Sequence, residues 1–143
     1  MSMTFEDLDA WAKARELVNR IYSITRQAPL AKDFGLCGQV QRAAVSVMSN
    51  VAEGFERAHG AEKLQAYNIA RASCGEVRSL LYVIEDNYPA SASAARDVRR
   101  LTSEAGSLTS GLIASTRRRL IGRASSAITA LAVVVWIGFH LVR

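Results

Sequence analysis

The chain has 143 residues, of which 50% are hydrophobic and 7% aromatic, and it contains two prolines. This length suits one domain that buries its own core, and the wealth of Ala, Leu and Arg favours helices over strands. Residues 1–116 carry 13 Lys or Arg and 13 Asp or Glu, so the net charge of +5 comes from residues 117–143. Polyanion binding by residues 1–116 therefore gains nothing from net charge.

The first predicted helix starts after Thr4 and ends before Pro29. Thr4 can cap it, and acidic residues in its first turns suit the helix dipole. Its predicted apolar face comprises Phe5, Leu8, Trp11, Val18, Ile21 and Tyr22. The acidic N-terminus does not resemble a signal peptide, and two cysteines fit a reducing compartment, so we expect a cytoplasmic protein.

The second predicted helix begins at Asp33, a good N-cap, and ends near Arg57, with Gly60 suited to its C-terminal cap. Two adjacent apolar faces run along it, where a helix of a small domain needs only one. We therefore expect this helix to pack between several neighbours and to make contacts beyond its own monomer. The first face comprises Leu36, Val40, Ala43, Val47, Asn50 and Gly54, and the second Cys37, Ala44, Met48, Val51 and Phe55.

Two further helices are predicted before residue 119. The third occupies residues 61–87 and stops at Tyr88 and Pro89. The fourth is capped by Ser91 or Ser93, and its apolar residues recur at alternating steps of three and four. These residues are Val98, Leu101, Ala105, Leu108 and Leu112. Short connections make sequential helices antiparallel neighbours, so residues 1–119 are predicted to form an all-α, up-down-up-down four-helix bundle.

Residues 120–143 are predicted to form an extra, apolar C-terminal helix. Residues 124–142 are 19 residues without formal charge, and a helix of that length spans about 28 Å, close to the bilayer core. Four basic residues precede it and match the cytoplasmic flank of a membrane helix: Arg117, Arg118, Arg119 and Arg123. We expect residues 124–142 to anchor the chain to the inner membrane. The alternative for this segment is a fifth helix packed in protein, and the alternative for the arginines is RNA binding.

A polar patch lies within the second helix. Ser46, Asn50 and Glu53 step by four and three along one side, with Gly54 beside them. One interpretation is an interface or pore-facing patch that binds a ligand or partner. The other is structural: Gly54 permits close helix approach, while Asn50 and Glu53 bond to neighbouring helices or subunits. Buried polar residues often fix the register and oligomeric state of bundles, so the structural interpretation is favoured.

A second candidate site is a basic cluster for polyanions. Folding the third and fourth helices about residue 90 brings position 78 level with 102, so Arg78, Arg99 and Arg100 can converge. Phosphate binding needs such a cluster. Three acidic residues lie close enough to neutralise it, which favours a solvated salt-bridge surface.

Catalytic chemistry finds little support in the sequence. Cys74 lies at a core position, and the nearest candidate base, His59, is about 22 Å away along one helix. Cys37 is offset too far along the helices to form a disulfide with Cys74. There is no close pair of metal ligands, no phosphate loop and no dinucleotide fingerprint. We therefore expect no enzyme, no cofactor and no metal.

Several ordered motifs resemble one bacterial family: residues 5–8 with Trp11 and Ala14, residues 39–46, residues 50–54, and residues 70–73 with Glu76. Over residues 4–115 the chain resembles the four-helix bundle proteins first noticed in open reading frames within 23S rRNA intervening sequences. The resemblance implies a homo-oligomer, usually a pentamer, around a central axis, and no settled activity. A related bundle is the accessory protein of diversity-generating retroelements, which binds nucleic acid and the reverse transcriptase.

These observations lead to two functional hypotheses. The first is a non-enzymatic, homo-oligomeric scaffold or adaptor that is tethered to a membrane. The second is a nucleic-acid-binding accessory protein with RNA or a reverse transcriptase as its partner. The balanced charge of residues 1–116 favours the first.

Overall fold

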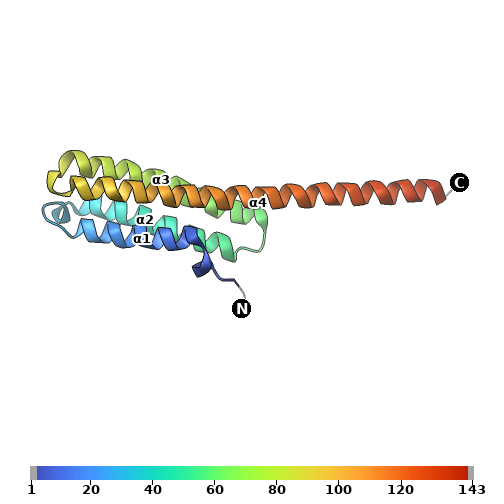
Figure 1. Cartoon of the computed structure of the whole chain (residues 1–143), viewed down its shortest axis with the longest axis horizontal. Helices are drawn as coiled ribbons and strands as arrows, with labels where there is room; N and C mark the ends of the chain where they lie inside the picture. The colour runs from blue at the N-terminus through green and yellow to red at the C-terminus, as the bar shows by residue number, and fades with distance from the viewer. Residues whose placement is uncertain (1–2, 142–143) are drawn as a thin grey trace.

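The computed structural model describes the backbone of residues 3–141 and the side chains of residues 3–122, 124 and 125. Within this part of the chain, consecutive long helices run antiparallel, and the first also packs against the last (Figure 1). The elements are η1 (Phe5–Asp7), α1 (Asp9–Thr25), η2 (Leu30–Lys32), α2 (Phe34–Glu56), α3 (Gly60–Asn87), η3 (Pro89–Ser91) and α4 (Ala92–Leu141). The structure confirms the predicted all-α, antiparallel four-helix architecture.

The start of α2 lies where the sequence predicts it. The Asp33 carboxylate accepts a hydrogen bond from the Leu36 backbone N–H at 3.0 Å, which satisfies a free donor of the first turn. The Tyr88 hydroxyl donates to the other carboxylate oxygen at 2.8 Å. Both donors favour the charged carboxylate, the Leu36 amide more than Tyr88, so the pKa of Asp33 is lowered. This residue therefore ties the end of α3 to the start of α2.

The start of α1 differs from the prediction. Thr4 caps the short helix η1 instead, and its backbone N–H donates to the Asp7 carboxylate at 2.8 Å. Leu8 is extended, with ψ at 123°, and α1 begins only at Asp9. The turn folds Phe5 back onto Trp11, whose ring it meets edge-on at 5.2 Å between centroids.

Both apolar faces of α2 are covered within the chain. Val40 and Val47 on the first face are fully buried, as are Ala44 and Val51 on the second. Helices α1 and α3 pack on either side of α2. The expectation that α2 lies between several neighbours is confirmed, but these neighbours belong to the same chain. The two faces by themselves therefore require no second copy.

Helix α4 buries Val98, Leu101 and Ala105 of the predicted stripe but not Leu108. Leu108 is 36% exposed, whereas Thr102 and Thr109 are fully buried. Each threonine hydroxyl donates to the carbonyl four residues earlier, at 2.7 and 2.8 Å respectively. Because this bond satisfies the only donor of the side chain, threonine fits the core and the predicted repeat is wrong at Leu108.

Helix α4 also has no break at residue 119. One helix runs from Ala92 to Leu141 and extends past the other three (Figure 1). Leu120 packs onto Gly60, where an added Cβ would lie 2.5 Å from its Cδ2. Gly60 therefore opens α3 and admits a neighbouring side chain, rather than capping α2. The expectation of a separate C-terminal helix from residue 120 is wrong, because nothing interrupts the backbone hydrogen bonds of α4.

The predicted membrane anchor falls mostly outside the described side chains. Among the residues whose side chains are described, no helix is long and apolar enough to cross a membrane. Of residues 124–142, only the first two belong to that set. The anchor therefore stays a prediction from the sequence.

Candidate functional site

The polar patch of α2 forms hydrogen bonds to α3 and within its own helix. The hydroxyl oxygens of Ser46 and Ser73 lie 2.8 Å apart, which joins the two helices. The Asn50 amide donates to the Ser46 carbonyl at 2.9 Å and to its hydroxyl at 3.2 Å. Ser73 is 7% exposed, so this is a largely buried polar contact between α2 and α3. The sequence identified Ser46 and Asn50 but not their partner.

Gly54 allows an aromatic ring to lie directly against α2. An added Cβ at this position would lie 2.6 Å from Cδ1 of Tyr67, and Tyr67 is 4% exposed. Burial raises the pKa of the Tyr67 phenol, and the charge of Arg119 opposes the shift. The Lys63 ammonium donates to the Gly54 carbonyl at 3.3 Å and to the Phe55 carbonyl, so it caps the end of α2.

Part of the patch reaches an open groove between α2 and α3. Glu53 forms an ion pair with Arg57 one turn later, and both side chains are half exposed. The groove has a volume of about 220 Å³ and is lined by Asn50, Glu53, Arg57, Glu62, Gln65, Ala66 and Ile69. The four patch residues thus have separate contacts. Ser46 bonds across to α3, and Asn50 bonds to Ser46 within α2. Glu53 is paired at the surface, and Gly54 admits a ring.

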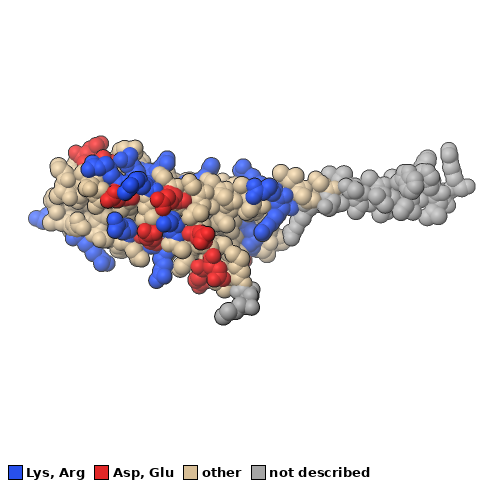
Figure 2. Space-filling view, viewed as in Figure 1, with Lys and Arg blue, Asp and Glu red and all other residues tan. Residues whose placement is uncertain are grey.

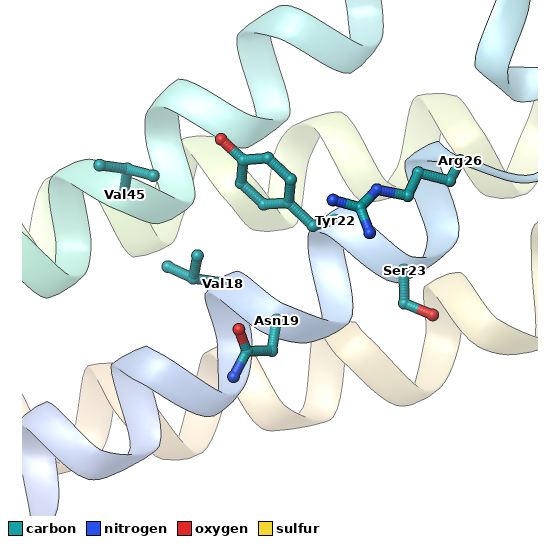
Figure 3. A pocket seen from close by; sticks show the side chains of 6 residues that line it. All are labelled: Val18, Asn19, Tyr22, Ser23, Arg26 and Val45. Atoms are coloured by element: carbon teal, nitrogen blue, oxygen red, sulfur yellow. The ribbon is translucent and has the colours of Figure 1, made fainter.

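A larger groove lies between α1 and α2, about 520 Å³ in volume, and the sequence did not indicate it. Figure 3 shows Val18 and Val45 on its two sides, with Arg26 beside Tyr22 and with Asn19 and Ser23 turned away from α2. The Arg26 guanidinium lies 5.8 Å from the centroid of the Tyr22 ring. Arg26 is the only charged group in this lining, so the lining holds no carboxylate or imidazole that could act as a base toward the Ser23 hydroxyl.

The described contacts of Arg78, Arg99 and Arg100 differ, and the predicted cluster of the three stays a prediction. Arg99 lies over the Tyr82 ring at 4.1 Å and pairs with Glu85 at 3.1 Å. Arg100 pairs with Asp97 at 2.8 Å and lines a charged groove between α1 and α4. Arg78 instead lines a groove between α3 and α4. The three arginines therefore belong to different surroundings, because local acids and an aromatic ring hold two of them.

The groove between α3 and α4 has a basic rim and a floor of small residues. Arg71 and Arg78 stand on α3, and neither has an ion-pair partner among the described residues. The volume is about 450 Å³, and the remaining lining is Cys74, Gly75, Thr102, Ser103, Gly106, Ser107 and Ser110. Arg71 was missed by sequence reasoning, although its spacing of seven residues from Arg78 could have indicated it.

Another basic group lies where α4 leaves the bundle. Arg117, Arg118 and Arg119 are all exposed there, and Figure 2 shows Lys and Arg gathered beside the start of the grey segment. Elsewhere on that face positive and negative side chains are intermingled (Figure 2). The side chain of Arg123 lies outside the described residues.

The two cysteines are buried and free. The Cys37 thiol donates to the Leu30 carbonyl at 3.3 Å. Burial raises the pKa of Cys74 to about 11, against a smaller opposing effect of the Arg78 charge. Because the thiolate is the nucleophilic form, Cys74 is poorly suited to attack at neutral pH. Its predicted distance from a base is consistent with the structure, in which His59 is exposed at the start of α3.

Comparisons with known proteins agree with this architecture. The family model of the 23S rRNA-intervening sequence protein matches residues 6–111. A crystal structure from Bacteroides thetaiotaomicron VPI-5482, described as a protein with unknown function from the S23 ribosomal protein family, is similar with a TM-score of 0.67. It is 19% identical, and the match covers 73% of this chain and 94% of that chain, which shows a shared fold. No curated protein matches the chain. Since the family model spans most of its length, the chain belongs to the 23S rRNA-intervening sequence protein family.

Proposed function

We propose that this protein is a non-enzymatic scaffold or adaptor that assembles with further copies of itself. The observation that supports this proposal is an exposed stripe on α3. Ile69 and Val83 are 44% and 43% exposed, and Glu76 lies midway between them. Residues seven apart lie on one side of a helix, about 10 Å apart along its axis, so the three line the same side of α3. Isolated exposed apolar residues are ordinary, but an ordered stripe indicates a contact surface.

The surroundings of this stripe are typical of a protein interface. Ile69 borders the groove that also holds Asn50, Glu53 and Gln65. Interfaces combine apolar contacts with a polar rim that supplies hydrogen bonds. This arrangement supports the interface interpretation of the patch on α2, and it leaves the buried Ser46–Ser73 contact as part of the fold.

The oligomeric state is tested by light scattering of the full chain after size-exclusion chromatography. We expect a closed assembly, and the family resemblance points to a pentamer. A shorter chain for this test should retain Leu120, because a chain that ends at residue 119 loses the contact with Gly60. A stable monomer at micromolar concentration would contradict the proposal.

A nucleic-acid-binding accessory protein is the second candidate. Arg71 and Arg78, which have no ion-pair partner in the described part of the chain, favour it, together with the exposed residues 117–119. The balanced charge of residues 1–116 weighs against it, because few counterions would be released. A gel-shift titration with RNA and duplex DNA at about 150 mM salt tests this candidate. Submicromolar binding with a steep salt dependence would favour it over the scaffold.

Membrane attachment through residues 124–142 is a separate proposal that rests on the sequence. Its support is the run of 19 residues without formal charge, preceded by the basic residues 117–119 and 123. Cell fractionation of the full chain beside a chain that ends at residue 125 tests it. Recovery of the full chain with the soluble fraction would refute the anchor.

A further inference from the structure

Helix α3 carries an apolar stripe with one acidic residue on one outer side and two arginines on the other. Ile69, Glu76 and Val83 lie on the side toward α2, as the position of Ile69 in the α2–α3 groove shows. Arg71 and Arg78 lie on the side toward α4 and line the α3–α4 groove. Among the residues with described side chains, Glu76 and these two arginines have no ion-pair partner.

We propose that the α3–α4 groove of one copy receives the Ile69–Glu76–Val83 stripe of the next copy, with Glu76 against Arg78. This inference rests on the proposed self-assembly and names the two surfaces that form it. The interface is head-to-tail, because different faces of the same chain meet. Such an interface closes into a ring when the rotation between copies is a whole fraction of a turn.

The angle between the two faces suits a small ring. They are adjacent sides of a four-sided bundle, so their outward directions differ by about 90°. In a ring with its axis along the bundles, the two contact faces of a copy differ by about 90° for four copies and about 108° for five. The helices of neighbouring copies then run parallel, and equivalent residues lie at equal height along the ring axis.

Equal height brings complementary residues together. Glu76 and Arg78 differ by two residues along α3, which is about 3 Å of axial offset. Val83 and Tyr82 differ by one residue, about 1.5 Å. Tyr82 is 51% exposed and lies toward α4, where it contacts Arg99. The stripe of one copy therefore faces an opposite charge and an apolar group of the next copy, without any axial shift between the two bundles.

A second charge pair follows from the packing of α4 on α3. Gly60 packs against Leu120, and the two helices are antiparallel. Glu62, two residues after Gly60, is therefore level with Arg118, two residues before Leu120. Glu62 borders the α2–α3 groove and has no ion-pair partner among the described residues, and Arg118 is exposed. In the ring, Glu62 of one copy approaches the arginines at 117 and 118 of the next.

The floor of the groove suits a helix better than a phosphate backbone. A Cβ added at Gly75 would meet nothing within 4 Å, so the groove is open above it. The hydroxyls of Ser103, Ser107 and Ser110 donate to carbonyls of their own helix at 3.1, 3.0 and 2.9 Å. Because these donors are already satisfied, they tolerate apolar contacts and offer little to an anion. Small residues also let two helices approach closely.

Charge reversal at the proposed pair tests the assignment. In a homo-oligomer, Glu76→Arg and Arg78→Glu each place like charges across every interface. We expect each single variant to weaken self-association by about tenfold or more in analytical ultracentrifugation of the full chain. The double variant E76R/R78E restores opposite charges and should recover the assembly. The matched control is Arg100→Glu, because Arg100 lies on the α1–α4 side and pairs with Asp97.

The outcomes separate the surfaces from the assembly itself. A monomeric wild type would refute self-assembly, and the inference with it. An oligomeric wild type whose mass is unchanged by both single variants would overturn the choice of surfaces alone. Loss of assembly in the single variants without recovery in the double variant would overturn the Glu76–Arg78 pairing, provided circular dichroism shows folded helices. If R78E keeps the assembly but loses binding to a single-stranded RNA probe, the groove serves nucleic acid instead.

Discussion

Replacing Gly54 with alanine tests the packing between α2 and α3. The new Cβ would lie 2.6 Å from Tyr67 Cδ1, and real Cβ atoms do not approach so closely. Tyr67 is 4% exposed, so its ring cannot swing into solvent to relieve the clash. Overpacking of a core commonly costs about 1–3 kcal/mol. Alanine in a helix interior recovers about 0.5–1 kcal/mol relative to glycine.

The net expectation is a loss of about 1–2 kcal/mol in the free energy of unfolding. With a urea dependence of about 2 kcal/mol per molar, the unfolding midpoint falls by about 0.5–1 M. The measurement is urea denaturation followed by far-UV circular dichroism at fixed protein concentration. The matched control is Gly111→Ala in α4, where an added Cβ meets nothing within 4 Å. This control should gain about 0.5–1 kcal/mol.

A smaller ring at position 67 isolates the cause. In a Tyr67→Leu background, Gly54→Ala should cost less than it does alone, because the clashing atoms are gone. If Gly54→Ala proves as stable as Gly111→Ala, the close approach of the ring does not constrain α2 and the reasoning is refuted.

Three further predictions concern charges and thiols. The pKa of Asp33 is lowered in the folded chain, so its carboxylate stabilises the fold above the unfolded pKa of about 4. This contribution is lost as the pH falls further. Asp33→Ala should therefore lower the urea midpoint at neutral pH, and the difference from wild type should disappear in acid. Arg99→Ala should lower the free energy of unfolding by about 1 kcal/mol, because it loses an ion pair and a ring contact. Arg100→Ala removes a more exposed pair and should lower it by less than about 0.5 kcal/mol. The reverse order of the two variants in thermal melts would contradict this. Cys37 and Cys74 should react with a thiol reagent at about pH 8 only after denaturation, and rapid native labelling would show that the core opens.

Local signals in the sequence predicted the helices well. Asp33 was recognisable as an N-cap because a carboxylate before an apolar run satisfies free backbone donors. Tyr88 and Pro89 marked the end of α3 because proline cannot continue a helix. Thr102 and Thr109 were missed as core residues, since their hydroxyls bond to their own helix and cost little when buried.

Long-range contacts explain what the sequence did not predict at the candidate site. Gly54 was correctly expected to permit close helix approach, but nothing local identifies Tyr67 as the group that uses the space. Arg78 was grouped with Arg99 by their level along the bundle. Two side chains at the same height along the bundle can point in different directions, and Arg99 forms an ion pair with Glu85. The position of a charge on a helix is therefore predictable, but its partner is set by the fold.

The unbroken course of α4 links the direction of its last residues to the bundle. Each residue of an α-helix advances the chain by about 1.5 Å and turns it by about 100°. Because α4 continues without interruption from the core contacts to Leu141, its distal part has a fixed rotational phase relative to α1, α2 and α3. Deleting one residue after Leu120 would turn the rest of the helix by about 100° relative to the bundle, whereas deleting seven would nearly restore the phase and shorten the helix by about 10 Å. The affinity of any partner that binds the distal part of α4 should therefore vary periodically with the number of residues removed.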